Sequence, residues 1–126
     1  MTPFSHVALP ATPDALAPDG SEVRLLAGLS AGSMAHFTLH PGHVSKAVRH
    51  RTVEEIWFIL GGEGEMWRRQ EGKHATLDLT PGISLTIPVG TEFQFRSTGT
   101  VALTAVAITM PPWPGEGEAE FVEGMW

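Results

Sequence analysis

The chain has no cysteine among its 126 residues, which excludes disulfide bonds and thiolate metal ligands. Its first residues lack the basic start and apolar core of a secretory signal peptide. The longest apolar-rich run, residues 101–110, is far too short to span a bilayer. These absences are compatible with a reducing compartment, and we expect a cytoplasmic protein without a membrane partner.

Basic residues are also scarce, because 8 Lys and Arg oppose 14 Asp and Glu, for a net charge of −6. No basic stripe is present, which argues against a nucleic-acid partner. Four acidic residues lie in the last eleven positions: Glu116, Glu118, Glu120 and Glu123. The body of the chain is therefore nearly neutral, and the tail carries most of the negative excess.

A sustained helical period is absent as well. Short apolar or alternating runs are instead separated by glycine and proline at intervals of roughly 8–12 residues, which is typical of a β-sandwich or closed barrel. The predicted strands are 23–29, 34–39, 45–50, 55–60, 65–69, 74–79, 84–87, 92–97 and 101–110. We predict one all-β domain, with an N-terminal arm (1–20), a barrel (21–110) and an acidic tail containing proline and tryptophan (111–126).

Two predicted strands, 55–60 and 101–110, are apolar on both faces over most of their length. A strand buried on both sides needs a second covering layer. Either the termini of the same chain or a second subunit would provide it, and of the two we expect a homodimer.

The stretch from His50 to Gly64 brings together a histidine, a carboxylate five residues later (Glu55), an apolar run and a glycine cluster. The cluster, residues 61–64, lacks the lysine and the helix start of a phosphate-binding loop. It is predicted to be a hairpin turn. His50 and Glu55 are then two polar groups at the mouth of a strand.

Two glycine-containing patterns resemble the motifs of the cupin superfamily. The first comprises Gly42, Val48, His50, Glu55 and Gly62. The second comprises Gly82, Pro88, Gly90, Phe93 and Ser97. The resemblance implies a double-stranded β-helix, which is a small jelly-roll barrel and is often dimeric.

The resemblance also implies a ligand set, from which this chain departs. Metal-binding cupins hold a divalent ion with two histidines and a glutamate of the first motif and one histidine of the second. Here Val48 and Phe93 occupy two histidine positions, so only His50 and Glu55 stand at ligand positions. No cofactor is certain; a divalent metal (Zn, Mn, Fe or Ni) would need a further ligand. His36 is the first candidate, and His43 beside a turn is a weaker one.

Three interpretations of His50 and Glu55 stay open: an incomplete metal site, a hydrogen-bonded pair that binds a polar ligand or transfers protons, and a structural pair without chemistry. An apolar lining would raise the pKa of Glu55 unless His50 or a metal compensated it. Strand alternation predicts that these side chains line the interior as ligand-binding residues: Val48, His50, Glu55, Trp57, Phe93, Phe95 and Ser97.

The predicted function is a small-molecule-binding cupin of the sugar-isomerase-like type, with a carbohydrate or small carboxylic acid in the barrel. His50 and Glu55 would carry recognition or catalysis. One alternative is a metal-dependent cupin enzyme, an isomerase or oxygenase, that uses His50, Glu55 and a ligand outside the motifs. Another is a non-catalytic dimeric barrel that acts as a sensor or an accessory subunit.

Overall fold

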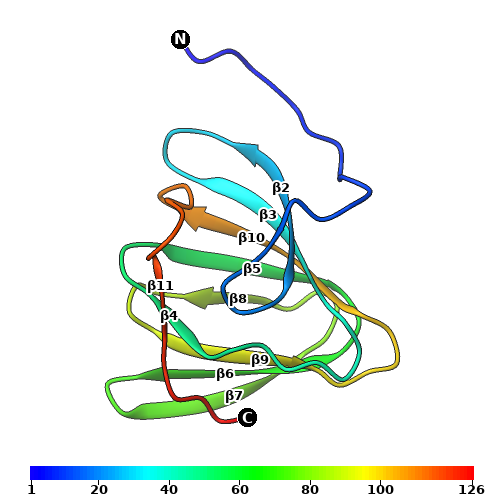
Figure 1. The fold of residues 1–126 in the computed structure, drawn as a ribbon, viewed down its shortest axis with the longest axis vertical. Coiled ribbons are helices and arrows are strands. Elements are labelled where there is room, and N and C mark those ends of the chain that lie inside the picture. The colour runs from blue at the N-terminus through cyan, green and yellow to red at the C-terminus, as the bar shows by residue number, and fades with distance from the viewer.

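A computed structural model describes all residues from Met1 to Trp126 and contains two antiparallel β-sheets that pack face to face (Figure 1). The strands are β1 (Ala15–Leu16), β2 (Glu22–Gly28), β3 (Ser33–Leu39), β4 (Val48–His50), β5 (Glu54–Gly61), β6 (Gly64–Gln70), β7 (Lys73–Leu79), β8 (Ser84–Ile87), β9 (Glu92–Ser97), β10 (Leu103–Met110) and β11 (Ala119–Phe121). The six-stranded sheet has the order β1-β2-β3-β10-β5-β8, and the five-stranded sheet has the order β11-β4-β9-β6-β7. The all-β prediction is confirmed. No helix of the kind that could cross a membrane occurs in the chain.

The core lies between the sheets and follows the alternation of each strand. In β5, Trp57 and Ile59 are buried, whereas Ile56, Phe58 and Leu60 are each 45% exposed. Burying one such large apolar side chain stabilises a fold by roughly 1.5–3 kcal/mol. The largest fully buried apolar side chains come from both sheets: Trp57, Phe93, Phe95, Ile59, Met66, Leu79, Ile87, Val48 and Val53.

The glycine cluster after β5 is not a hairpin, so that prediction is wrong. β5 pairs with β10 and β8, whereas β6 pairs with β7 and β9, so the cluster carries the chain from one sheet to the other. Gly62 adopts a φ of +76°, and a Cβ at Gly64 would clash with the carbonyl oxygen of Arg96. The corner therefore requires glycine for its backbone conformation and for the close approach of β9.

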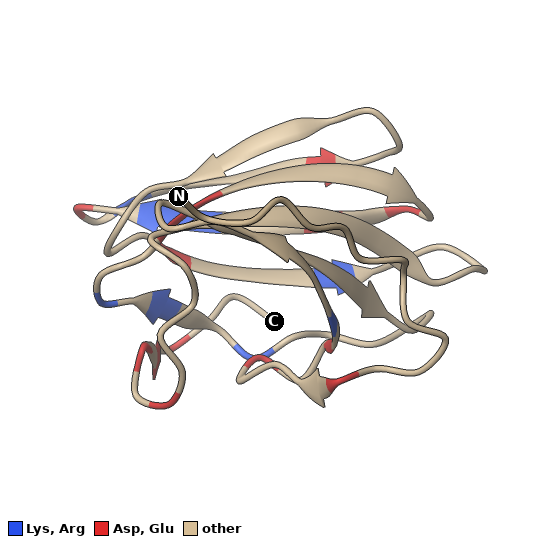
Figure 2. Ribbon diagram, turned by 90° about the horizontal axis from the view of Figure 1, so that it is seen from above, with Lys and Arg blue, Asp and Glu red and all other residues tan.

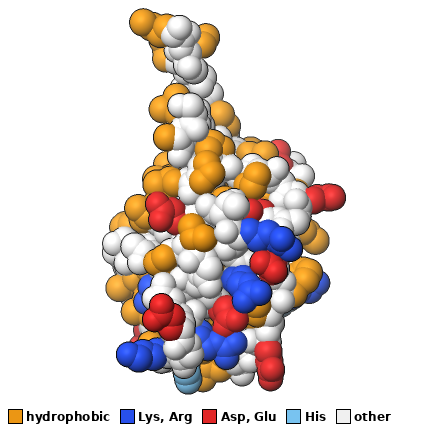
Figure 3. Space-filling model, turned by 90° about the vertical axis from the view of Figure 1, so that its left-hand side faces the viewer, with side chains coloured by type: hydrophobic (Ala, Val, Ile, Leu, Met, Phe, Trp, Pro, Cys, Tyr) orange, Lys and Arg blue, Asp and Glu red, His pale blue; other side chains and the backbone are white.

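The outer faces of the two sheets differ in character. The outer face of the five-stranded sheet carries cross-strand ion pairs, including Arg96 with Glu65 at 2.7 Å and Arg69 with Glu92. In Figure 3, acidic and basic side chains alternate on the lower part of the body. In Figure 2, most of the length of the strands is tan, so few strand positions are charged. The outer face of the six-stranded sheet exposes Ile56, Phe58, Leu60 and Ile108. The N-terminal segment contacts this face at Arg24 and leaves these four side chains uncovered.

The two ends of the chain take different courses. Residues 1–9 extend away from the barrel (Figures 1 and 3), and the chain reaches it at Pro10, whose carbonyl oxygen accepts a hydrogen bond from Arg24 of β2. The segment after β10 instead returns along the barrel and forms β11, which pairs with β4 in the register Ala119 to His50 and Phe121 to Val48. The sequence did not predict β1 or β11, since each is a short edge strand without apolar alternation.

Candidate functional site

A cavity of about 490 Å³ opens at one end of the barrel, between the sheets. We call it the barrel cavity. Its walls come from β1 and the loop after it, from β2 and β3, from the inner faces of β4, β5, β9 and β10, and from the segment between β10 and the start of β11. The lining residues are Ala15, Leu16, Ala17, Pro18, Asp19, Val23, Leu25, Leu26, Ser33, Met34, Ala35, Phe37, Val48, His50, Glu55, Trp57, Phe93, Thr109, Pro112, Trp113 and Ala119. Most are apolar, and Asp19, His50 and Glu55 are the only titratable ones.

His50 and Glu55 meet on the inner wall because β4 and β5 both present them inward. The His50 Nδ1 atom lies 3.8 Å from Oε1 of Glu55, which is too long for a hydrogen bond. The indole Nε1 of Trp57 donates a 2.8 Å hydrogen bond to the other carboxyl oxygen, Oε2. Nδ1 of His50 is buried without any hydrogen-bond partner. His50 and Glu55 are therefore close together, but Nδ1 of His50 and Oε1 of Glu55 have no hydrogen-bond partner in the protein. Both atoms are available to hydrogen-bond a ligand in the cavity.

Aromatic rings surround this pair. The His50 imidazole is held edge-on between Phe93, at 5.3 Å between ring centroids, and Trp113, at 5.0 Å. Phe37 stacks on Trp57 with 5.4 Å between centroids and an interplanar angle of 5°. These rings fix the orientation of His50 and exclude water from the carboxyl of Glu55.

This environment shifts both pKa values. Burial raises the pKa of Glu55 from 4.5 to about 7, against the hydrogen bond from Trp57 and with a further contribution from the charge of Asp19. Burial lowers the pKa of His50 from 6.5 to about 4, although the charge of Glu118 opposes this. Near neutral pH the imidazole is uncharged and the carboxyl gains and loses a proton readily. Perturbed pairs of this kind are typical of functional sites.

The structure brings together most of the residues predicted to line the interior. Val48, His50, Glu55, Trp57 and Phe93 all lie on the wall of the barrel cavity. The other two predicted lining residues are buried in the barrel but do not reach this wall: Phe95 and Ser97. Phe95 packs against Trp57 at 5.0 Å between centroids, which makes it a support behind the wall.

The two histidines proposed as additional metal ligands lie elsewhere. His36 pairs with Val106 across β3 and β10, in the outward-facing register, so it lies on the opposite face of the sheet from Glu55. His43 lies in an exposed turn, with its ring 6.0 Å from that of His40. The structure brings neither of them to His50.

The donor set does not fit a resident divalent metal. Catalytic metal sites usually have three protein ligands. Here Val48 and Phe93 occupy two of the four ligand positions that the resemblance implies, so only His50 and Glu55 remain, and one oxygen of Glu55 already accepts a hydrogen bond from Trp57. No group of three His, Cys, Asp or Glu side chains is placed to hold an ion. We therefore derive no chemistry through a metal.

Among the wall residues that the sequence did not predict, Asp19 and Trp113 bear on the chemistry of the pair. Asp19 is 7% exposed, and its Oδ1 accepts hydrogen bonds from the backbone and hydroxyl of Ser21 at 2.9 and 2.7 Å. Burial nevertheless raises its pKa, against these hydrogen bonds. Trp113 reaches His50 from the tail. The sequence signals only a proline-rich turn before Asp19 and a proline-flanked tryptophan, because both residues reach the site through tertiary packing.

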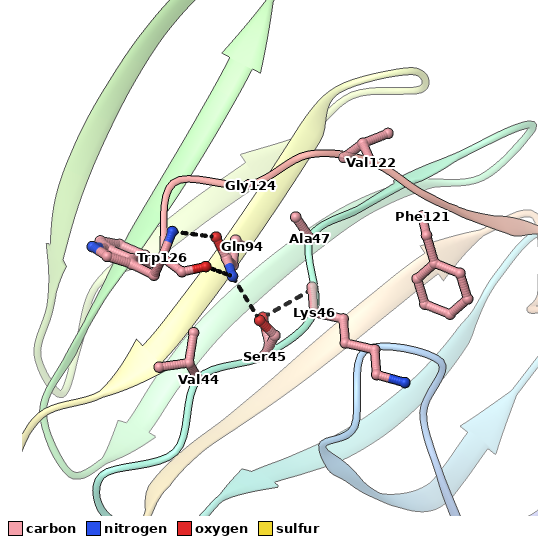
Figure 4. A pocket seen from close by; sticks show the side chains of 9 residues that line it. All are labelled: Val44, Ser45, Lys46, Ala47, Gln94, Phe121, Val122, Gly124 and Trp126. Carbon is pink, nitrogen blue, oxygen red and sulfur yellow. Dashed lines mark hydrogen bonds between the residues drawn. The ribbon is translucent and has the colours of Figure 1, made fainter.

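A second hollow, of about 500 Å³, lies on the outer side of the five-stranded sheet beneath the tail (Figure 4). Its centre is the side chain of Gln94, which donates to the carbonyl oxygens of Ser45 at 2.9 Å and Trp126 at 3.1 Å. The amide oxygen of Gln94 accepts from the backbone nitrogens of Met125 and Trp126, each at 2.9 Å. Every polar atom of this amide is satisfied, so the hollow is a shallow seam where the tail is anchored. It is far from the chemistry of Glu55.

The fold and the inward-facing pair define a double-stranded β-helix with an apolar cavity. The family model described as a cupin domain matches residues 35–109, and the chain belongs to this family. The predicted superfamily is thus confirmed.

Solved structures show the same fold. A structure of the capsular polysaccharide assembling protein CapF from Staphylococcus aureus is 16% identical, with a TM-score of 0.73, and the match covers 86% of this chain and 33% of CapF. The chain thus spans about a third of that protein. A Klebsiella pneumoniae protein with a double-stranded β-helix domain is 15% identical, with a TM-score of 0.68, and the match covers 82% and 85% of the two chains.

A third neighbour is Lactobacillus farciminis oxalate decarboxylase in complex with formate, at 15% identity and a TM-score of 0.71. The match covers 81% of this chain and 31% of that one. No curated protein sequence matches the chain. At these identities the likeness shows the fold alone.

Proposed function

We propose that the barrel cavity binds a small molecule that has an apolar body and a polar head, and that Glu55 exchanges a proton with this head. The observation that carries the proposal is a cavity of about 490 Å³ whose apolar wall contains an unpartnered His50 nitrogen beside Glu55. Apolar walls with a few fixed polar groups are the usual composition of small-molecule sites.

The proposed roles follow from the geometry of the pair. A ligand atom between Nδ1 of His50 and Oε1 of Glu55, which are 3.8 Å apart, lies within hydrogen-bond distance of both. Because the pKa of Glu55 is about 7, its carboxyl is suited to serve as a general acid or base near neutral pH. Uncharged His50 would orient the head, and Trp57 would hold the carboxyl in place.

The ligand predicted from the sequence, a carbohydrate or small carboxylic acid, is consistent with the names of two neighbours, CapF and oxalate decarboxylase. The composition of the cavity wall argues against a carbohydrate. A carbohydrate needs many hydrogen-bond partners, and the side chains on this wall provide few besides Asp19, His50 and Glu55. We therefore place the polar head at His50 and Glu55 and the apolar body against the aromatic rings.

A thermal-shift and fluorescence screen tests the proposal, since Trp57 and Trp113 lie on the cavity wall. Compounds with a single aromatic or aliphatic body and one hydroxyl, carboxyl or amine head are expected to raise the melting temperature in the presence of a chelator. Glu55→Gln is expected to lose this response, while Glu54→Gln, at an exposed position of the same strand, is expected to keep it. If no compound stabilises the protein, the proposed function is wrong.

We also propose that the protein is a homodimer through the bare face of the six-stranded sheet. Ile56, Phe58, Leu60 and Ile108 are 37–45% exposed there, and neither terminus of the chain covers them. The outward positions of the neighbouring strand β8 are the uncharged Ser84 and Thr86, and the charged residue of β5 on this face, Glu54, lies at the end of the strand. Light scattering is expected to give a dimer for the wild type and a monomer for Phe58→Glu. A monomeric wild type would contradict this proposal.

A further inference from the structure

We propose that the ligand of the barrel cavity is a small amphipathic amine, bound as its ammonium ion. This inference rests on the proposed function and specifies the head of the ligand. The carboxyls of Asp19 and Glu55 are the only acidic groups on the cavity wall, and no lysine or arginine lies on it. A cationic head would therefore find partners where an anionic head would find none.

The nearby basic side chains are engaged elsewhere. Arg24 points away from the cavity, and its Nε donates to the carbonyl oxygen of Pro10 at 2.9 Å. The Lys46 ammonium lies 5.3 Å from the centre of the Phe121 ring, on the tail side of the molecule. The two buried carboxyls therefore have no positive partner from the protein itself, and burial raises the pKa of each.

Three acceptors face the place where the head would lie. Oε1 of Glu55 makes no hydrogen bond to the protein, and Nδ1 of His50 is orphaned although the residue is only 5% exposed. Uncharged imidazole offers an acceptor nitrogen, which an N–H donor satisfies. Asp19 adds a carboxyl from the loop between β1 and β2. An ammonium group has several N–H donors and no acceptor, so it matches this set in both charge and hydrogen bonding.

The aromatic rings add a second, independent match. Trp57, Phe93 and Trp113 line the cavity around His50. The electron-rich faces of such rings attract cations, most strongly where water is excluded. The same rings also provide an apolar surface for the body of the ligand. A carboxylate head would instead meet two carboxyls and no lysine or arginine.

The test compares three probes with the same body and different heads: 3-phenylpropylamine, 3-phenylpropanol and 3-phenylpropionate. Binding is measured by calorimetry at pH 8, where Glu55 is mostly ionised and the amine is charged. We expect the amine to bind at least about tenfold more tightly than the alcohol, as for charge-assisted hydrogen bonds, and the carboxylate to bind most weakly.

Variants locate the source of this preference. Glu55→Gln and Asp19→Asn are each expected to reduce the advantage of the amine over the alcohol to less than about threefold, because an amide cannot balance the charge of the ammonium ion. Glu54→Gln is the matched control, because its carboxyl is exposed on the same strand, and it is expected to keep the full advantage. Circular dichroism verifies that each variant is folded, and Glu55→Gln suffices if Asp19→Asn does not fold.

The outcomes separate this inference from the proposed function. If the alcohol or the carboxylate binds as tightly as the amine, the cavity binds ligands but the ammonium assignment is wrong. If the preference for the amine persists in Glu55→Gln and Asp19→Asn, the charge is recognised elsewhere, and the inference also fails. If none of the three probes binds, both the inference and the proposed function are overturned.

Discussion

Two glutamates of this chain are almost equally buried, yet their pKa values shift in opposite directions. Glu55, on the cavity wall, is 4% exposed, and Glu118, in the tail, is 5% exposed. Glu55 accepts one hydrogen bond, from Trp57, and burial raises its pKa to about 7. Glu118 also experiences burial, but hydrogen bonds from Thr52 and Val53 outweigh it and lower the pKa.

The difference between these two carboxyls lies in their depth and in the donors that surround them, because Glu55 lies between the sheets whereas Glu118 is shielded from solvent close to the protein surface. Oε1 of Glu118 accepts from the backbone nitrogens of Thr52 and Val53, each at 2.7 Å, and the hydroxyl of Thr52 contacts both oxygens at 2.8 and 2.9 Å. These hydrogen bonds stabilise the ionised carboxylate of Glu118, and they hold the tail against the turn before β5. Glu55 keeps one oxygen free of protein donors. Burial alone therefore assigns no role, whereas the number of donors separates a structural carboxylate from one available to a ligand.

The largest expected effect comes from removing the structural carboxylate. Glu118→Ala leaves the donors of Thr52 and Val53 buried without acceptors, and we expect a loss of roughly 4 kcal/mol in the free energy of unfolding at pH 7. Because the pKa of Glu118 is lowered, its contribution is present above pH 4.5 and is lost as the pH falls. Urea denaturation measures both. Glu116→Ala, at an exposed position of the same segment, is the control, and an equal loss in the two variants would contradict the comparison.

Glu55 is expected to show the opposite pH dependence. Between pH 4.5 and about 7 the folded chain keeps a proton on Glu55 that the unfolded chain releases, so rising pH destabilises the fold. The shift corresponds to roughly 3 kcal/mol over this range. Glu55→Gln removes this term and keeps an acceptor for Trp57. The wild type is therefore expected to lose roughly 3 kcal/mol relative to Glu55→Gln as the pH rises through this window.

In the wild type, the titration of His50 masks the pH dependence of stability that Glu55 causes. The comparison with Glu55→Gln is therefore needed to detect it. Between about pH 4 and 6.5 the unfolded chain binds a proton on His50 that the folded chain does not, so stability rises with pH. The two contributions nearly cancel between pH 4.5 and 6.5. Glu118 titrates in both proteins and drops out of the difference, whereas the charge of Asp19 is one cause of the raised pKa of Glu55 and is therefore part of the difference. Parallel stability curves for the wild type and Glu55→Gln would show that Glu55 has an ordinary pKa.

The sequence predicted the position of Glu55 but not the role of Glu118, and the reason is physical. Alternation within β5 placed Glu55 and Trp57 inward, and the glycine and proline spacing predicted the strands and the barrel. The role of Glu118 depends on contacts with Thr52 and Val53, more than sixty residues earlier. No local pattern marks a residue whose partners lie so far away along the chain. The same limitation hid Asp19 and Trp113, and it led to the wrong prediction of a hairpin at residues 61–64.

A smaller effect is expected when a new carboxyl without sufficient donors is built beneath the tail. Gln94→Glu keeps the acceptor for Met125 and Trp126 but removes the two N–H donors to the carbonyl oxygens of Ser45 and Trp126. We expect a loss of roughly 2 kcal/mol at pH 7, as for a pair of lost buried hydrogen bonds. Low pH should restore part of this loss, because a protonated carboxyl can donate to a carbonyl oxygen again. Urea denaturation at pH 5 and pH 8 tests this, and an unchanged stability at both would contradict the anchoring role of Gln94.

The smallest effect is expected at Arg49, because its ion pairs with two glutamates are exposed to solvent. Its side chain lies 3.6 Å from Glu120 and 3.9 Å from Glu92, but it is 44% exposed. Water and salt screen such pairs, so Arg49→Ala should cost less than about 1 kcal/mol, and the cost should shrink further at high salt. A double-mutant cycle with Glu120→Ala isolates the pair. A coupling close to the effect of Glu118→Ala would mean that the charges of the tail, and not the buried donors around Glu118, hold it against the barrel.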